Sequence, residues 1–162
     1  MSNLVKLIFL DIDGVLNAFG SYGTRTGTLP KSVIMGIEEE KVQILSKLIK
    51  ETDALLILTS SWKVGWEKDK VKRTKHFDYL EEILAKYNLY ITDKTDDLSF
   101  NRGHGIKKYL KKFKNKEIKY VILDDDIFSD YDNSLLKHLV KTDNKLGLTD
   151  EDVQKAISIL NA

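Results

Sequence analysis

The sequence predicts a doubly wound α/β domain, with a parallel sheet of about five strands covered by helices on both faces, in a three-layer, Rossmann-like arrangement. Three short segments are apolar almost throughout: Leu4–Leu10, Ala54–Leu58 and Val121–Leu123. Patterns typical of amphipathic helices lie between them. Strands that are apolar on both faces and alternate with helices are typical of a buried parallel sheet rather than of a half-exposed antiparallel one.

Each element has its own signal along the chain. Leu4–Leu10 is interrupted only by Lys6, and two weaker strand candidates are Leu89–Ile91 and Leu139–Val140. Four helices are predicted because their apolar residues fall on one helical face. These residues are Val42, Leu45, Leu48 and Ile49; Phe77, Leu80, Ile83, Leu84 and Tyr87; Ile106, Tyr109, Leu110 and Phe113; and Val153, Ala156, Ile157 and Leu160. Thr149 and Asp152 are spaced like a capping box before the last helix.

A chain of 162 residues fits one domain, spanning 1–162, and can bury a sizeable core. It has no Cys, which excludes disulfides, thiolate metal sites and thiol nucleophiles. The apolar run Leu7 to Leu10 is too short for a signal peptide or a membrane span, so we expect a cytoplasmic protein with no membrane partner. The stretch 17–37 holds four of the nine Gly and the only Pro, and is expected to form a loop or flap after the first strand.

The near-zero net charge conceals an uneven distribution. The 26 Lys and Arg residues balance 25 Asp and Glu, which alone suggests no preference for a polyanion. However, Lys63 to His76 holds six Lys and Arg against two acidic residues, and Lys107 to Lys119 holds seven Lys against one Glu. Asp124 to Asn133 holds five Asp and no cation. Solvated helix faces also produce such basic stretches, so the charge pattern alone leaves both interpretations open.

Polar residues follow three of the predicted strands where each one ends. The first strand ends in Asp11-Ile12-Asp13-Gly14, the second in Thr59-Ser60-Ser61, and the fourth in Asp124-Asp125-Asp126. Ligands of doubly wound sheets bind outside the carboxyl ends of the strands, where these residues should meet. Clustered carboxylates repel one another without a cation, and such hard oxygen donors suit Mg²⁺ together with a substrate phosphate. Three unrelated turn or cap residues would explain the pattern less well.

These residues also resemble the motifs of a known family. Phe9–Asn17, which reads FLDIDGVLN, resembles the first motif of the haloacid dehalogenase (HAD) superfamily in its phosphatase form. Leu58-Thr59-Ser60 resembles the second motif, Arg102 is the best match to the third, and Val121–Asp125 resembles the fourth. The DxDGVLN start, the Thr-Ser-Ser-Trp run and the Gly-Leu-Thr tail are similar to the HAD domain of Swiss-army-knife-type RNA repair proteins.

The resemblance implies a Mg²⁺-dependent phosphomonoester hydrolase that forms an aspartyl-phosphate. Asp11 would be the nucleophile, and Asp13 would protonate the leaving oxygen and then activate water. The metal ligands would be Asp11, the backbone carbonyl of Asp13, Asp124 and Asp125, the last either directly or through water.

The resemblance leaves alternatives for the groups that would bind the phosphate. Thr59 or Ser60 would bond a phosphoryl oxygen, because the end of the second strand is uncertain by one residue. Arg102, or Lys107 one helical turn later, would neutralise the phosphoryl oxygens. We expect His104 in a Gly-rich loop and Trp62 in the core rather than stacked on a substrate base. Asp126 and Asp130 are expected behind the metal ligands or in solvent.

The expected substrate follows from the missing cap and from the charges. HAD phosphatases usually carry a cap domain after the first or third strand, and the segments available here are too short for a folded one. An open site, with the basic residues Lys63 to Lys75 after the hydroxyl row, favours a terminal phosphate of RNA or DNA. The alternatives are a phosphatase of nucleotides or other small phosphomonoesters and a non-catalytic HAD-fold binding module. A response-regulator receiver and a P-loop kinase do not fit the motif positions.

Overall fold

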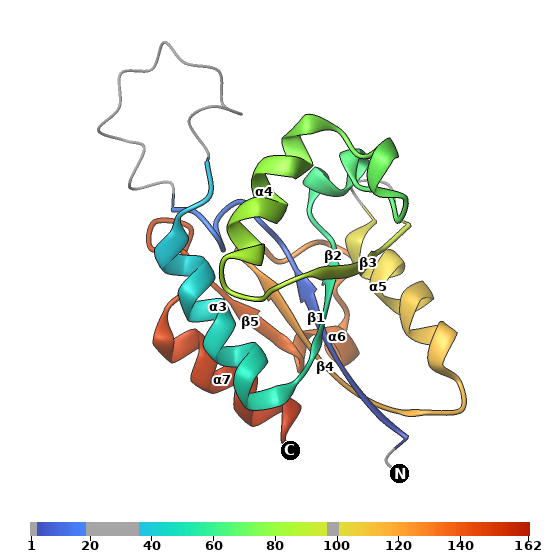
Figure 1. The fold of residues 1–162 in the computed structure, drawn as a ribbon. Helices are drawn as coiled ribbons and strands as arrows, with labels where there is room; N and C mark the ends of the chain where they lie inside the picture. Colours follow the sequence, from blue (N-terminus) through green and yellow to red (C-terminus); the bar gives the residue numbers. More distant parts are fainter. Residues whose placement is uncertain (1–2, 19–35, 97–100) are drawn as a thin grey trace.

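The computed structural model describes residues 3–18, 36–96 and 101–162. In this part of the chain five strands form one parallel sheet in the order β3-β2-β1-β4-β5 (Figure 1). The strands are β1 (Leu4–Leu10), β2 (Leu55–Leu58), β3 (Ile91–Lys94), β4 (Glu117–Asp124) and β5 (Leu139–Lys141). The helices are α3 (Glu39–Thr52), α4 (Lys75–Ala85), α5 (Arg102–Leu110), α6 (Asn133–Leu136) and α7 (Asp150–Leu160), with 3₁₀ turns η1 (Ser61–Gly65), η2 (Lys70–Lys72) and η3 (Lys111–Phe113). The predicted fold class is confirmed.

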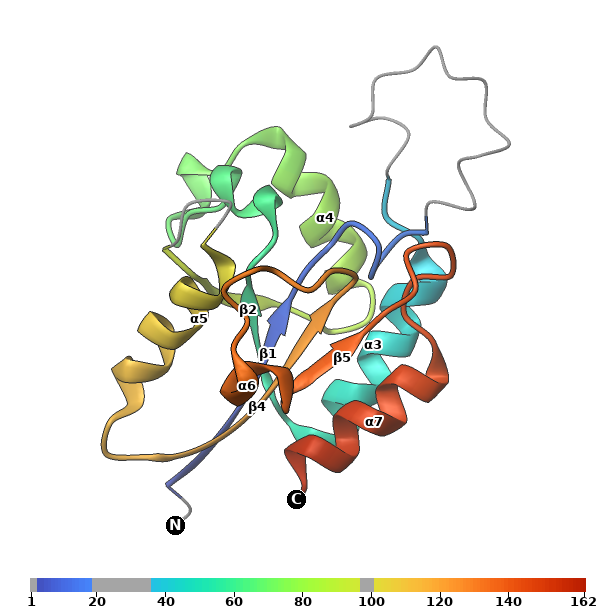
Figure 2. The same cartoon turned by 180° about the vertical axis from the view of Figure 1, so that it is seen from behind.

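Two hydrophobic cores cover the two faces of the sheet. Along β1, Ile8 and Leu10 belong to the core beneath α3, α4 and α7, whereas Leu7 and Phe9 belong to the core beneath α5, η3 and α6. Figures 1 and 2 show α3 and α7 side by side in one layer. Because both faces are covered, β1 must be apolar at consecutive positions, which is why its sequence does not alternate.

The strand order reverses direction at β1, and this determines where a ligand can bind. The chain moves from β1 outward to β2 and β3, then returns to the other side of β1 with β4 and β5. In open α/β sheets a crevice forms beyond the carboxyl ends of the strands at such a reversal. The ends of β1 and β4 are therefore the positions at which this fold places a site.

The third strand lies later in the chain than the sequence pattern predicts. A strand was expected at Leu89–Ile91, but β3 begins at Ile91. Asn88 adopts a left-handed conformation with φ 59°, and the Leu89 amide donates to the Leu84 carbonyl oxygen at 3.0 Å. Leu89 is therefore buried because it closes the end of α4, not because it belongs to the sheet.

The fourth strand is longer than predicted, and the last helix begins where expected. β4 extends back to Glu117 because its first residues pair with the half-buried start of β1, a stretch without a strong apolar pattern. The Asp152 amide donates to Thr149 Oγ1 at 3.2 Å, and the Thr149 amide donates to Asp152 Oδ2 at 3.0 Å. This confirms the capping box ahead of α7.

The expected flap at 17–37 lies mostly outside the described residues. In the described part of the chain the connection from β2 to α4 contains only η1 and η2, so it forms no large cap. None of the described helices is long and apolar enough to cross a membrane.

Candidate active site

The sheet places Asp11, Asp124 and Thr59 side by side at its carboxyl edge. Leu10 of β1 is in register with Leu123 of β4, and the Asp11 amide donates to the Leu123 carbonyl oxygen at 2.9 Å. On the other side, the Thr59 amide donates to the Leu10 carbonyl oxygen at 2.9 Å. Both aspartates and the threonine are buried. Strand pairing alone therefore brings these three positions together, as the sequence predicts.

Asp11, Asp124 and Asp125 form a compact group of carboxylates. Each offers an oxygen atom, and these atoms all lie within 4.8 Å of one another. Burial and the nearby charge of Asp124 raise the pKa of Asp11 well above its usual range. Burial also raises the pKa of Asp125, with Asp124 adding to the effect. Such a cluster of hard oxygen donors is costly without a cation and fits Mg²⁺ by its donor chemistry.

Arg102, the first residue of α5, reaches two of these carboxylates. Its Nη1 donates to Asp124 Oδ2 at 2.8 Å and lies 3.2 Å from Asp11 Oδ1. Its guanidinium carbon lies 4.2 Å from the centre of the Phe128 ring. Burial lowers the pKa of Arg102, but the two carboxylates together outweigh burial and raise it, so the side chain stays charged. Its buried Nε has no hydrogen-bond partner among the described residues.

Lys107, the alternative cation, lies away from the carboxylate group. It forms an ion pair with Asp132, and both side chains are partly exposed. Its ammonium group lowers the pKa of the Asp132 carboxyl by hydrogen bonding to it. Of the two cations that the sequence offers for the third motif, the structure brings only Arg102 to Asp11 and Asp124.

Asp130 fixes the start of α5 and thereby the position of Arg102. Its Oδ1 accepts a hydrogen bond from the Gly103 amide at 3.0 Å, and its Oδ2 accepts one from the His104 amide at 2.9 Å. A Cβ atom on Gly103 would lie 2.5 Å from the Asp130 carbonyl oxygen, so only glycine permits this approach. The prediction that His104 lies in a loop is wrong, because His104 belongs to the first turn of α5.

Asp126 is exposed, as expected.

Asp13 lies apart from the carboxylate group and is held by two other side chains. Trp62 Nε1 donates to both Asp13 Oδ1 and Oδ2 at 3.2 Å, and Asn17 Nδ2 donates to Oδ1 at 3.1 Å. The next residue, Gly14, has φ 84°, and a Cβ there would lie 2.4 Å from Asp125 Oδ2. The Asp-Gly turn therefore requires glycine. The two carboxylates of the first motif have different contacts, Asp11 with the carboxylate group and Asp13 with Trp62 and Asn17.

The two candidate hydroxyls have different environments. Ser60 Oγ accepts a hydrogen bond from the Trp62 amide at 3.2 Å and caps η1. Thr59 Oγ1 is buried and has no partner among the described residues. A buried hydroxyl without a partner costs free energy unless a ligand satisfies it. This difference favours Thr59 over Ser60 as the group that would bond a phosphoryl oxygen.

Sequence reasoning missed three residues that support the site. Tyr131 donates its hydroxyl hydrogen to Asp124 Oδ2 at 3.0 Å, and Thr142 Oγ1 donates to the Gly14 carbonyl oxygen at 2.7 Å. Asn17 Oδ1 accepts from the Gly14 amide at 2.7 Å. Only Asn17 carried a local signal, since it closes the FLDIDGVLN segment. Thr142 contacts a residue far away in the sequence, whereas Tyr131 lies in the loop that follows Asp124, and no local pattern indicates either contact.

The basic stretch after β2 is only partly on the surface. Lys63 is buried and donates from Nζ to Thr95 Oγ1 at 3.1 Å, so the expected surface does not begin there. The Arg73 side chain is also buried and pairs with Glu81. The exposed lysines of this stretch are Lys68, Lys70, Lys72 and Lys75.

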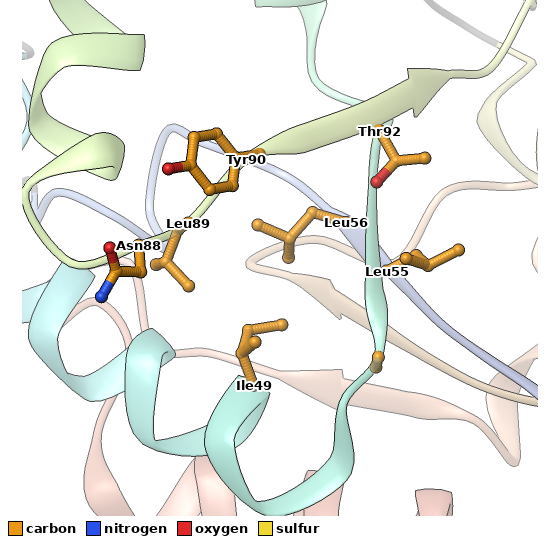
Figure 3. Close-up of a pocket in the computed structure, with 8 residues that line it drawn as sticks. Ile49, Leu55, Leu56, Asn88, Leu89, Tyr90 and Thr92 are labelled. Carbon is orange, nitrogen blue, oxygen red and sulfur yellow. The ribbon is translucent and has the colours of Figure 1, made fainter.

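A separate hollow lies at the opposite edge of the sheet. It has a volume of about 150 Å³ and lies at the amino ends of β2 and β3. Figure 3 shows Leu55, Leu56, Leu89 and Tyr90 around it. Its lining is mostly apolar and includes no charged side chain among the residues that the structure describes, so it differs in chemistry and in place from the carboxylate group.

The comparison with protein families agrees with the geometry. The model of the HAD domain in Swiss Army Knife RNA repair proteins matches residues 7–153. This chain belongs to that HAD family. The matched range contains every residue of the carboxylate group, Arg102 and Thr59, and membership supports a HAD-type phosphatase in general terms. Searches of curated proteins and of solved structures found no significant match to this HAD domain.

Proposed function

We propose that this HAD domain is a Mg²⁺-dependent phosphomonoester hydrolase that acts on a terminal phosphate of a nucleic acid. The observation that carries the proposal is the group of Asp11, Asp124 and the half-buried Asp125, in which Arg102 contacts the two buried carboxylates of Asp11 and Asp124. An arrangement of crowded carboxylates beside a fixed cation suits the binding of both a metal ion and a phosphate. Thr59 Oγ1 and Arg102 Nε supply buried donors that lack partners among the described residues.

In the proposed reaction the chain itself supplies the nucleophile and the acid. An Asp11 carboxylate oxygen attacks phosphorus, the bond to the leaving oxygen breaks, and Asp13 gives its proton to that oxygen. Asp13 then takes a proton from water, whose oxygen attacks the aspartyl-phosphate and releases phosphate and the Asp11 carboxylate. Arg102 and Thr59 would hold the phosphoryl oxygens throughout.

The residues present fit a magnesium ion. Asp11, Asp124, Asp125 and the backbone carbonyl of Asp13 would hold it, and when bound it offsets the charge of the carboxylates and of the incoming phosphate. The raised pKa values of Asp11 and Asp125 reflect how unfavourable this group is without a cation.

A nucleic-acid substrate is supported by the family and by two lysines. The matching family is named for RNA repair proteins. Lys68 and Lys112 come from the two basic stretches, and both approach Asp93 Oδ2, with Nζ at 3.5 and 4.0 Å. Asp93 is in register with Ile57 of β2, the strand that leads to Thr59. This lysine pair would bind the phosphate backbone of a polynucleotide by charge, without reading its sequence.

The test is a set of turnover assays with purified protein. We expect hydrolysis of 4-nitrophenyl phosphate with Mg²⁺ and none after EDTA treatment. RNA and DNA oligomers carrying a 5′-phosphate or a 3′-phosphate, and RNA oligomers carrying a 2′,3′-cyclic end, are then compared with nucleotides and sugar phosphates. We expect kcat/KM to be higher on one class of polynucleotide end than on any of the small phosphates. Equal or better rates on small phosphates would replace it with the small-molecule alternative, and no turnover at all would favour the non-catalytic module.

Metal binding can be checked without turnover. Mg²⁺ should raise the melting temperature of the wild-type protein, because it binds the folded carboxylate group and not the unfolded chain. An Asp124→Asn variant should lose most of this shift. An equal shift in both proteins would show that Mg²⁺ binds elsewhere.

A further inference from the structure

Trp62 makes a polar contact that its burial does not require. Its ring is largely buried and belongs to the core beneath α3, α4 and α7. Its indole nitrogen nevertheless donates to both carboxylate oxygens of Asp13 at 3.2 Å. These residues are distant in sequence and come from the turns after β2 and β1. The expectation that Trp62 packs in the core is therefore correct, but packing is only part of what this residue does.

Trp66, four residues later, is a second buried tryptophan with which Trp62 can be compared. Its ring is also buried, and the Arg73 guanidinium carbon lies 4.7 Å from the ring centre. Its Nε1 has no hydrogen-bond partner among the described residues. Since the core accepts the Trp66 indole, whose nitrogen has no partner in the described part of the chain, burial alone does not explain why Trp62 Nε1 faces a carboxylate.

A second side chain restrains the same carboxylate. Asn17 Nδ2 donates to Asp13 Oδ1 at 3.1 Å, while Asn17 Oδ1 accepts from the Gly14 amide at 2.7 Å. Asp13 Oδ1 thus receives two donors and Oδ2 receives one. Hydrogen bonds from two buried groups limit rotation of the Asp13 carboxyl group, which is otherwise only half-buried.

We infer that Trp62 is a positioning residue for the acid–base carboxylate of Asp13. Resting on the proposed function, this inference assigns the indole N–H the task of holding the carboxyl group in the orientation from which it protonates the leaving oxygen. Trp62 does not touch the phosphate and acts only through Asp13. Loss of the N–H should therefore slow those reactions that depend most on proton donation to the leaving group.

The experiment compares Trp62→Phe with Trp66→Phe, the same chemical change in the same turn region. Each variant is assayed with Mg²⁺ on an alkyl phosphate, which needs an acid, and on 4-nitrophenyl phosphate, whose leaving group does not. Because kcat/KM covers steps up to departure of the leaving group, it reports the acid function of Asp13 and not the later hydrolysis. Melting temperatures of both variants monitor the fold.

Trp62→Phe should lower kcat/KM on the alkyl phosphate by about 10- to 100-fold, part of the usual general-acid contribution. On 4-nitrophenyl phosphate it should lower kcat/KM by about threefold or less. Trp66→Phe should change both substrates by the same small factor. If Trp62→Phe lowers both substrates equally, Trp62 is only a packing residue and the inference is wrong, while the proposed phosphatase stands. A wild-type protein inactive on both substrates would overturn the proposed function itself.

A spectroscopic readout tests the same contact without turnover. The chain has two Trp residues, so a ¹⁵N-labelled sample gives two indole N–H signals, which the two Phe variants assign. An Asp13→Ala substitution should shift the Trp62 signal and leave the Trp66 signal in place. Unchanged positions of both signals would show that Trp62 does not hold Asp13 in solution.

Discussion

The two edges of the same sheet are built from opposite chemistry. At the carboxyl edge, Asp11, Asp124 and Thr59 are buried together, with like charges adjacent and a hydroxyl that lacks a partner among the described residues. At the amino edge, Leu56 and Leu89 line an apolar hollow (Figure 3). Buried charges cost folding free energy, whereas buried apolar groups supply it. Substitutions should therefore separate activity at one edge from stability at the other.

The largest effect is expected from Asp11→Asn. Turnover of 4-nitrophenyl phosphate should fall by at least about 10³-fold, because the amide cannot attack phosphorus. The melting temperature without metal should stay the same or rise. Since the fold raises the Asp11 pKa, the ionised form at neutral pH opposes folding, and Asn removes that charge. Asp150→Asn on α7 serves as the control and should retain activity. If Asp11→Asn retains turnover close to that of the wild-type protein, Asp11 is not the nucleophile.

Arg102→Ala and Lys107→Ala form the next pair. Arg102→Ala should lower kcat by about 10²- to 10³-fold, as expected for loss of a fixed donor to a phosphoryl oxygen. It should also lower the melting temperature measured without metal, since two buried carboxylates lose their cation. Lys107→Ala should change kcat less than about twofold, because its partner is the exposed Asp132. Equal losses of kcat in the two variants would show that contact with Asp11 and Asp124 does not give Arg102 a special role.

Leu89→Ala tests the amino edge. Removal of this buried side chain should lower the free energy of unfolding by about 2–5 kcal/mol, because it closes α4 and lines the hollow. Urea denaturation measures the loss. The kcat of the folded protein should be unchanged, since the site lies at the other edge. A large fall in kcat at retained fold would show that the two edges are coupled.

The smallest effect concerns the lysine pair. A Lys68→Ala, Lys112→Ala double variant should lower kcat/KM on a phosphorylated oligonucleotide by about tenfold at low salt, with a weaker dependence on salt concentration. Its activity on 4-nitrophenyl phosphate should not change. The control, Lys47→Ala with Lys155→Ala, removes exposed lysines from α3 and α7. Parallel losses in both double variants would reflect net charge and would remove the case for a specific surface.

Sequence patterns predicted those features that depend on neighbouring residues. The continuous apolar runs predicted the parallel sheet. The aspartates at the strand ends predicted which positions the pairing of β1 with β4 brings together. The Leu89–Ile91 strand was misplaced because a buried helix-closing leucine and a strand residue have the same local pattern. The different environments of the Thr59 and Ser60 hydroxyls could not be predicted, since they depend on which of the two caps η1.

Contacts between distant turns could not be predicted. Trp62 and Asp13 are far apart in sequence, and only the pairing of β1 with β2 brings their turns together. Tyr131 reaches Asp124 because a loop returns over the end of β4, and no periodic pattern encodes that path. Similarly, the burial of Lys63 could not be predicted, because it depends on a contact with Thr95, which follows β3.

Detection of a phosphorylated aspartate tests whether Asp11 is the nucleophile. In Asp13→Asn, water activation should be slow while 4-nitrophenol, a good leaving group, still departs, so the aspartyl-phosphate should accumulate. Acid-quenched samples with Mg²⁺ and substrate are digested and analysed by peptide mass spectrometry. We predict one added phosphoryl group on the peptide that contains Asp11. Stoichiometric release of nitrophenol with no phosphorylated peptide, or with the phosphoryl group on another residue, would show that Asp11 is not the nucleophile.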